Sequence, residues 1–493
     1  MDSLLFLCAR RVAAQSPLPA LPPHLYPVLF QVAFLDGRAL VLRDLVATWP
    51  FPVLNFQWLV GHRELLQDHD YTLCVEAVIQ AVAAQLQREL EEPSHDFRWV
   101  LLQVLDMTGL SDSISSHKHT WMTIWHSTVA LAMACGEVSK HQQEFQRHGS
   151  KQHKGCSGAA TAALEPLCVD VHTDLCVDRT SFGIVRDALQ TGATGPLRIK
   201  CRELEASNIS ASEIRTLLES LDPSCMRRLN LFFNILGLTE LSEILTRLLR
   251  FPELRSLNLP GNTLDVQHPM PESTAGIRCL AMQLGMLPGL REFNLGSTRL
   301  SGNLCQILCD LQAPLESLGL GYCSLVPADL AFLSQSFHAP ALKRLDLSGH
   351  NISQDLLEPL QLLLEETSAS LLYLDLTDCD MADSHLATLL PTLLRCSRLR
   401  FLQLSCNPLS TAAIKDLLQK ALELPDLHLV VYPVPKNCYK REPSGFSGIC
   451  VLDEELLVAT TTEISQLLAN SGRTDLVWTH SPLGHGALDY FSL

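Results

Sequence analysis

The stretch Leu254-Arg-Ser-Leu-Asn-Leu-Pro-Gly-Asn-Thr-Leu264 decides the fold. It matches the leucine-rich-repeat pattern L-x-x-L-x-L-x-x-N-x-L at every defined position. Because side chains alternate along a strand, we expect Leu257 and Leu259 to point into a core while the residues between them face outward. Asn262 is expected to satisfy backbone groups in the turn that ends the strand.

The same pattern recurs along the second half of the chain. Repeats start at residues 226, 254, 290, 315, 342, 371 and 399, so the starts are 28, 36, 25, 27, 29 and 28 residues apart. Apart from the 36, these spacings fit the roughly 20–29-residue period of such repeats. Between the strands the apolar spacing changes to that of a helix, as in Leu357 to Leu364. The sequence therefore predicts an α/β leucine-rich-repeat solenoid with parallel strands inside, helices outside and helical caps at both ends.

Four segments are expected. Residues 1–136 are predicted to form a helical N-terminal cap, 167–430 the repeats, and 431–493 a C-terminal cap. Lysine, histidine, glutamine, serine and glycine dominate residues 137–166, which predicts a disordered loop. The loop's metal-ligating residues follow no structural zinc spacing, so no metal site is expected. They are His141, His148, His153 and Cys156. Less regular strands are predicted near residues 102–107, 169–171 and 197–199.

The composition limits the partners. The chain has 37 basic and 53 acidic residues, a net charge of −16, which argues against nucleic acid or an anionic membrane as the main partner. Its 17 cysteines are scattered without a C-x-x-C pair, so reduced thiols are expected. With no secretory signal and no apolar run of roughly 18–20 residues, we expect a soluble protein of the cytoplasm, or of the cytoplasm and nucleus.

Several short segments outside the regular repeat positions are distinctive. They are Leu25-Tyr-Pro-Val-Leu-Phe30, Trp49-Pro-Phe51, Val104-Leu-Asp106, Pro314-Leu-Glu-Ser-Leu318, Tyr432-Pro-Val-Pro435 with Tyr439, and Asp489-Tyr-Phe-Ser-Leu493. Together with the repeats, they resemble the PRAME family over nearly the whole chain. The resemblance implies a ribonuclease-inhibitor-like horseshoe that acts through protein contacts. The family includes substrate receptors of cullin 2 ubiquitin ligases, and one member is associated with damping Toll-like-receptor signalling to NF-kappaB by binding the inhibitor-of-kappaB kinase.

Two short motifs near the N-terminus allow a check of the ligase hypothesis. An elongin-binding box, S/T-L-x-x-x-C-x-x-x-apolar, places its leucine, cysteine and last apolar residue on one helical face that fits a groove. Its four positions are filled by Ser3, Leu4, Cys8 and Val12. A cullin 2 box, apolar-Pro-x-x-apolar-x-x-x-apolar, follows at Leu21, Pro22, Leu25 and Leu29. The alternative is an amphipathic cap helix that only packs on the first strands.

Two functions therefore remain open at this stage. In the first, the chain is a ubiquitin-ligase substrate receptor that docks elongin B/C and cullin 2 through its first 50 residues and holds a target on the horseshoe. In the second, it is a stoichiometric inhibitor that sequesters the inhibitor-of-kappaB kinase and needs no ligase. Neither function requires a cofactor, and the two could use different surfaces.

The concave face is a second candidate site. The residues on either side of each repeat's second leucine should face outward there. The candidates for partner binding are Arg228, Glu292, Arg344, Asp346, Tyr373, Asp375, Phe401 and Gln403. Tyr373 and Phe401 are expected to be exposed aromatic rings on adjacent strands about 5 Å apart, so that truncating either leaves folding nearly unchanged. The alternative is a solvated face with incidental aromatics.

Catalysis has little support in the sequence. There is no P-loop, no G-x-G-x-x-G after a strand, no H-E-x-x-H and no G-x-S-x-G. His350 occupies the asparagine position of its repeat and is expected to be structural. Asp346 and Asp375 could form a carboxylate pair, but no nucleophile or enclosed pocket accompanies them. The sequence thus favours a non-enzymatic interaction protein.

Overall fold

The computed structural model divides the chain into two compact units, Met1–Asn230 and Leu231–Phe491. The structure describes residues 4–14, 18, 21–60, 71–91, 102–109, 118–152, 168–262, 271–352, 354–441 and 450–481.

In the first unit, helices alternate with four parallel strands that pair in chain order. The strands are β1 (Val53–Asn55), β2 (Val104–Asp106), β3 (Val169–Val177) and β4 (Leu197–Ser207). The helices are α1 (Leu4–Ala13), α2 (Tyr26–Leu35), α3 (Ala39–Ala47), α4 (Phe56–Val60), α5 (Thr72–Glu91), α6 (Lys118–Gln152), α7 (Phe182–Gly192) and α8 (Ala211–Ser220). The irregular strands predicted near residues 102, 169 and 197 are thus present, whereas β1 was not expected.

Two of the segments that carry the family resemblance form the core beneath the N-terminal helices. Phe30 is fully buried, and its ring meets those of Trp49 and Phe56 edge to face at centroid distances of 5.7 and 5.6 Å. Phe34 packs on the same Phe56 ring at 5.5 Å. Aromatic pairs of this geometry add stabilisation beyond the area they bury. These segments therefore hold α2 against the strand region rather than forming an exposed site.

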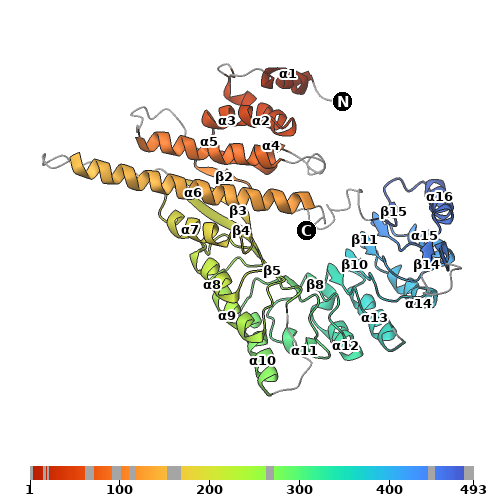
Figure 1. Cartoon of the computed structure of the whole chain (residues 1–493). Coiled ribbons are helices and arrows are strands. Elements are labelled where there is room, and N and C mark those ends of the chain that lie inside the picture. The colour runs from red at the N-terminus through yellow and green to blue at the C-terminus, as the bar shows by residue number, and fades with distance from the viewer. Residues whose placement is uncertain are drawn as a thin grey trace. The chain divides into compact units, whose positions relative to one another are not determined.

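The predicted disordered loop at residues 137–166 is wrong for its first half. Helix α6 continues without a break to Gln152, so the proposed boundary at residue 136 falls inside a helix that lies beside α5 (Figure 1). Leu131, Cys135 and Val138 are buried at helical spacing and Ser139 is buried with them, while Lys140, Gln143 and Glu144 are exposed. Lysine, glutamine and glutamate are good helix formers, so polarity alone did not predict a loop. Residues 153–166 lie outside the described residues.

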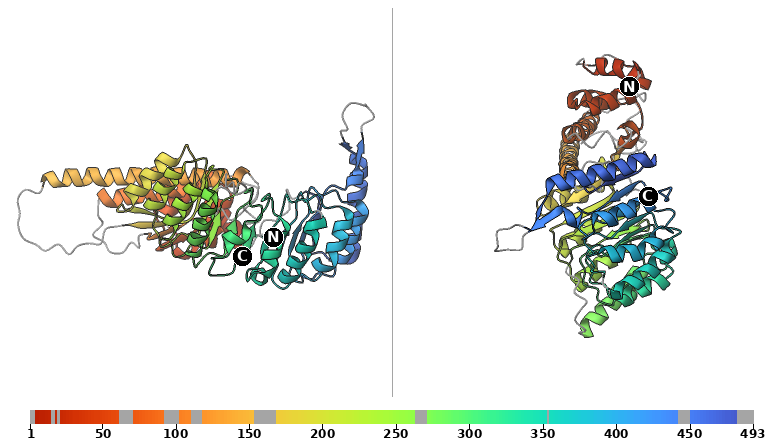
Figure 2. Two further views of the ribbon diagram at one scale, coloured as in Figure 1. Left: turned by 90° about the horizontal axis from the view of Figure 1, so that it is seen from below. Right: turned by 90° about the vertical axis from the view of Figure 1, so that its right-hand side faces the viewer.

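In the second unit, parallel strands again pair in chain order, and the helices stack beside one another along one side of the sheet (Figures 1 and 2). The strands are β6 (Ser256–Asn258), β7 (Glu292–Asn294), β8 (Ser317–Gly319), β9 (Arg344–Asp346), β10 (Tyr373–Asp375), β11 (Phe401–Gln403), β12 (Leu429–Val431) and β15 (Val477–Thr479). Strand β5 (Arg228–Phe232) crosses the division between the units. The helices are α9 (Leu238–Leu248), α10 (Pro271–Gly285), α11 (Leu304–Leu308), α12 (Pro327–Gln335), α13 (Gln354–Thr367), α14 (Asp383–Leu393), α15 (Thr411–Ala421) and α16 (Glu454–Ser471).

The register confirms the predicted repeats. The central residue of each strand pairs with the central residue of the next, from Leu257 through Phe293 to Leu402. All of these central side chains are at most 2 % exposed. Burying a leucine of this kind contributes about 1.5–3 kcal/mol, so the row is the main apolar support of the unit. The predicted α/β solenoid with inner parallel strands and outer helices is confirmed.

The asparagine position of the repeat acts as expected. The side-chain amide of Asn262 donates to the carbonyl oxygens of Leu231 and Leu259 at 2.6 and 2.9 Å, and its oxygen accepts the Leu236 N–H at 3.2 Å. Asn407 makes the equivalent bonds in the last repeat. One buried side chain therefore satisfies the backbone groups of two neighbouring turns.

The C-terminal segment continues the sheet. The repeats were predicted to end at residue 430, but β12 extends the row and β15 pairs with it in parallel after helix α16. A short antiparallel pair, β13 (Tyr439–Arg441) and β14 (Cys450–Leu452), precedes that helix. The predicted C-terminal cap thus contributes a strand as well as a helix, which the sequence did not reveal because Val477, Trp478 and Thr479 do not match the repeat pattern.

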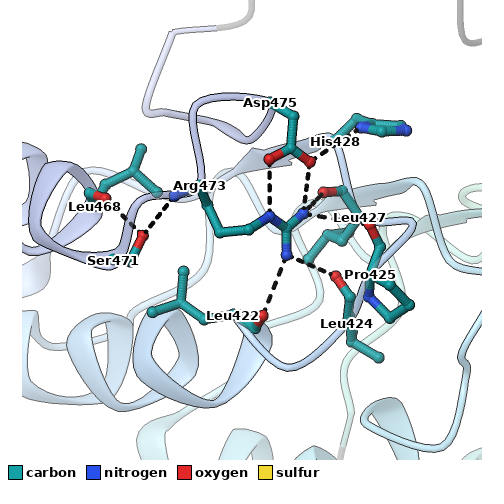
Figure 3. A network of polar contacts seen from close by, with 9 residues as sticks. All are labelled: Leu422, Leu424, Pro425, Leu427, His428, Leu468, Ser471, Arg473 and Asp475. Carbon is teal, nitrogen blue, oxygen red and sulfur yellow. Dashed lines mark hydrogen bonds and ion pairs between the residues drawn. The ribbon is translucent and has the colours of Figure 1, made fainter.

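Arg473 connects the segment before β15 to the last repeat through hydrogen bonds (Figure 3). Its guanidinium donates to the carbonyl oxygens of Leu422, Leu424 and Leu427 at 3.2, 2.9 and 2.8 Å. Both Asp475 carboxylate oxygens accept from the same group at 2.9 Å. These carbonyls follow the end of α15, where a helix leaves acceptors unpaired and where a positive charge is favoured. The planar guanidinium therefore fixes the turn before β15.

Candidate functional site

Helix α1 carries the predicted elongin-binding residues, and it exposes them. Leu4 is 78 % exposed and Cys8 is an exposed free thiol, while Val12 is partly buried. Leu5 and Leu7, at 54 and 50 % exposed, widen this apolar surface. Ser3 lies outside the described residues. The helix thus presents leucine side chains to solvent, where an ordinary cap helix would bury them.

The opposite side of α1 attaches it to the first unit through small residues. Ala9 and Ala13 are 7 and 1 % exposed, and the helix packs against α2. Arg10 forms an ion pair with Asp36 at 3.1 Å, and its guanidinium carbon lies 5.2 Å from the Phe6 ring centroid. The helix therefore packs on its neighbour through alanines and leaves its leucines in solvent, and the alternative of a cap helix without a partner stays open.

The predicted cullin-binding residues are divided by the fold. Pro22 is exposed, and Leu21 and Leu25 are partly exposed. Leu29 is 2 % exposed and belongs to the core face of α2. A partner could therefore contact the first three side chains, whereas Leu29 supports the helix from beneath. Sequence spacing could not make this distinction, because α2 is apolar around most of its circumference.

The concave-face candidates in the second unit lie as the register predicted. Arg344, Tyr373 and Phe401 pair directly across β9, β10 and β11. The second row pairs in the same way through Asp346, Asp375 and Gln403. Glu292 is partly exposed on β7. In the first unit, Arg228 forms an ion pair with Glu203 at 3.3 Å, and the Asn230 side-chain amide also donates to Glu203 at 2.7 Å.

Asp375 has an unusual electrostatic environment. Burial, together with the negative charge of Asp346 on the neighbouring strand, raises the pKa of Asp375 to about 6. The Tyr373 hydroxyl donates to its carboxylate at 3.2 Å, and the Thr377 N–H donates at 2.8 Å. Burial and the adjacent Asp375 also raise the Tyr373 pKa well above its ordinary value. Two carboxylates on adjacent strands would favour a cationic group of a partner at this point.

The prediction of exposed aromatic rings on this face is wrong for Phe401. Its side chain is 4 % exposed and stacks on Tyr373, with centroids 4.5 Å apart and planes 2° from parallel. Leu429 and Val431, at 1 and 0 % exposed, continue the apolar surface onto β12. The strand register was correct, but apolar neighbours on β12 and β15 turn this end of the face into a second core. Those residues were missed because β12 has no repeat signature.

The remaining sequence candidates lie only partly within the described residues. His141 lies on α6 with its Nε2 3.1 Å from a Glu91 carboxylate oxygen, nothing is described of the His148 side chain, and His153 and Cys156 lie outside the described residues. In the part of the chain that is described, no three metal-ligating side chains come together. The His350 Nδ1 lies 2.9 Å from the Leu347 carbonyl oxygen, in the turn position that asparagine fills elsewhere. No helix among the described residues is long and apolar enough to cross a membrane.

Comparison with known proteins identifies close relatives over the full length. The models of the PRAME N-terminal and C-terminal domains match residues 6–114 and 173–488. The chain is 42 % identical to leucine-rich repeat-containing protein 14 of Xenopus laevis and 40 % identical to that of Homo sapiens, covering all of both chains in each case. It is 30 % identical to human PRAME family member 20 over 86 % of this chain and 83 % of that protein.

Among solved structures, yeast Rad7 in its complex with Elc1 is similar at 17 % identity and a TM-score of 0.29, covering 55 % of this chain and 83 % of that one. LegL7 of Legionella pneumophila, a leucine-rich-repeat-containing protein, gives 16 % identity and a TM-score of 0.22, covering 79 and 95 % of the two chains. Both TM-scores are low, so the family assignment rests on the sequence relatives. Those relatives match along the whole chain and through both domain models, and this chain belongs to the PRAME family of leucine-rich-repeat proteins.

Proposed function

We propose that this protein is a substrate receptor of a cullin 2–elongin ubiquitin ligase, with helix α1 as its elongin-docking element. The observation that carries the proposal is that α1 buries its small residues and exposes its leucines. The helix attaches to its unit through Ala9 and Ala13 and leaves Leu4 and Cys8 in solvent. Exposure of Leu4, Leu5 and Leu7 to solvent is unfavourable, and burial of these side chains in a groove of a partner would recover that hydrophobic free energy.

The arrangement of the neighbouring segment supports a second contact beside the first. Pro22 and the partly exposed Leu21 and Leu25 lie in the sequence between α1, which ends at Ala13, and α2, which begins at Tyr26. In this proposal they face cullin 2, while Leu29 keeps α2 in place. The target protein would be held elsewhere, on the concave face of the second unit, where Glu292 and Asp346 remain partly exposed. Different surfaces would thus serve the ligase and its target.

The test is capture of recombinant elongin B/C by the full-length protein. The double variant Leu4→Ala with Cys8→Ala should lose most of the binding, because both side chains belong to the exposed face. Leu40→Ala is the matched control, since Leu40 is 68 % exposed on α3 of the same unit but outside the motif. Both variants should keep the wild-type melting temperature. Undiminished elongin capture by the double variant would overturn the proposal.

A measurement in cells distinguishes the ligase function from the alternative, in which the protein inhibits a kinase by stoichiometric binding. If the same double variant still damps NF-kappaB signalling as the wild type does, while elongin binding is lost, then ubiquitylation is not the mechanism of that damping. Sequestration of the inhibitor-of-kappaB kinase would then be the better account. Loss of both activities together would support the ligase function.

A further inference from the structure

The turns that follow the repeat strands hold one residue of each repeat in the left-handed backbone conformation. It is the residue just before the asparagine position, and its φ lies between 54 and 72° in all seven repeats. Glycine fits this conformation without strain, whereas a bulky or β-branched residue there is a genuine outlier. The repeats that use a small or polar residue have Gly261, Ser297, Gly349, Asp378 and Cys406. Such residues are therefore the rule at this position.

The first repeat departs from this rule at two positions of one turn. Phe233 precedes the asparagine of the repeat with a φ of 54°, and Ile235 follows it with a φ of 54°. In other repeats the left-handed residues that follow the asparagine position are Ser324 and Asp380, and residue 263 of the second repeat lies outside the described residues. Phe233 and Ile235 are 63 and 75 % exposed. The turn thus places two large apolar side chains in an unfavourable backbone conformation and leaves them in solvent.

Contacts within the fold do not account for this arrangement. The Phe233 ring lies against Gly261 of the next repeat, where an added Cβ atom would come 2.8 Å from the ring Cδ1. Tyr322 lies on Gly349 in the same way, but its hydroxyl also donates to Asp378 at 3.0 Å. Backbone strain of this kind persists at binding sites, where the surrounding structure holds it. Adjacent exposed apolar side chains likewise mark surfaces that contact other proteins.

The charges beside this turn indicate the chemistry of a partner. The Glu240 side chain folds back over Gly237 at the start of α9, where an added Cβ atom would come 2.8 Å from its Oε2. Glu240 is exposed and has no cationic partner among the described residues. A carboxylate without an internal counter-charge favours a cationic group of a partner. The exposed charges on later turns of the same edge are Arg299, Asp378 and Asp380.

We propose that Phe233 and Ile235 form a docking surface for a protein segment that carries apolar side chains next to lysine or arginine. The apolar side chains of the segment cover Phe233 and Ile235, and its cation pairs with Glu240. This surface follows the end of β5 and is separate from the strand positions of the concave face. It does not depend on the ligase function, because α1 belongs to the other unit.

Peptide selection tests the chemistry of the partner. A phage-displayed library of random dodecapeptides is first depleted on the full-length double variant Phe233→Asn with Ile235→Asn and then selected on the full-length wild type. The enriched consensus should combine aromatic or aliphatic residues with lysine or arginine. As a fluorescent peptide, it should bind the double variant at least about tenfold more weakly than the wild type. No enrichment, or a consensus without basic residues, would overturn the proposal.

The matched control is Leu362→Gln, which alters a 48 % exposed side chain on α13 in the same unit. This variant should bind the peptide as the wild type does, because Leu362 lies on the helix side of the sheet. An equal loss of affinity in Leu362→Gln and in the double variant would show that the turn is not the docking surface.

Thermal unfolding separates binding from a structural role. Asparagine tolerates the left-handed conformation, so the double variant should keep or exceed the wild-type melting temperature. Glu240→Gln should weaken peptide binding about two- to fivefold, because an exposed ion pair contributes little. A lower melting temperature of the double variant would show that Phe233 and Ile235 support the fold. That result, or an unchanged affinity of Glu240→Gln, would refute the inference.

Discussion

Replacement of Asp375 by asparagine tests the electrostatics of the concave face. Asp375 is largely buried beside Asp346, and these surroundings raise its pKa to about 6 from an ordinary value of 3.8. The folded protein therefore binds this proton more tightly than the unfolded chain does. The stability that the proton contributes is fully present below pH 3.8 and is lost as the pH rises through 6.

The magnitude follows from the two pKa values. At about 1.4 kcal/mol for each pKa unit, their difference corresponds to roughly 3 kcal/mol above pH 7. Asp375 keeps a small exposed fraction, so we expect Asp375→Asn to stabilise the protein by about 1–3 kcal/mol at pH 7.5. The amide oxygen can still accept the Thr377 N–H, so the turn should persist. At pH 4 the benefit should nearly vanish, because the wild-type side chain is then neutral as well.

Urea unfolding measured between pH 4 and 8 provides the assay. The unfolding free energy of Asp375→Asn minus that of wild type should rise as the pH increases from 3.8 to about 6 and level off above that. Glu423→Gln, at an exposed position, should show no such dependence. A stability difference that is independent of pH, or one that grows as the pH falls, would show that the carboxylate of Asp375 is not held near its neutral form.

Three further substitutions have expected outcomes in thermal and urea unfolding. Arg473→Ala should cost about 1–3 kcal/mol, because several backbone carbonyls lose their donor, and Arg473→Lys should recover only part of that loss. Phe401→Ala should cost about 3–5 kcal/mol, in contrast to the small effect expected for an exposed ring, and no loss of stability would contradict its burial. His350→Asn should stabilise by about 1 kcal/mol at pH 7, because the His350 Nε2 is buried without a partner while asparagine satisfies the same turn elsewhere. Burial lowers the His350 pKa, so the wild type should also lose stability relative to His350→Asn as the pH falls below 6.5, and a constant difference would refute this.

The repeats could be predicted from sequence because each of their positions has one physical task. A leucine at the centre of a strand must be buried, and Asn262 must satisfy two turns, so the residue types repeat wherever the geometry does. The predicted strand register was therefore correct. The candidate elongin-binding residues were also proposed from their spacing, and elongin binding stays a prediction. Which of its residues are exposed was not predictable, because Ala9 and Leu5 are both compatible with a buried helical face.

The errors occurred where one local signal has two physical causes. A polar run indicates a loop when no apolar stripe accompanies it, but residues 137–145 continue a helix whose earlier turns are anchored by Leu131 and Val138. Helix formation is cooperative, so a well-packed first half extends into a polar second half. A sequence segment that contains only the polar run does not include the buried residues that stabilise the helix.

The concave face shows the same ambiguity in three dimensions. Alternation along β11 correctly places Phe401 opposite the helices, and on most of this face such a position is partly exposed. Its burial depends on Leu429 and Val431, which lie on β12 after helix α15, and on Val477, which lies on β15 after helix α16. The alternation of residues along a strand therefore predicts the side of the sheet to which a side chain points, but not whether that side chain is exposed to solvent. The exposure of a side chain on this sheet is decided by segments far away in the sequence. For this reason the sequence alone placed Phe401 in an exposed interaction surface, although its side chain is buried.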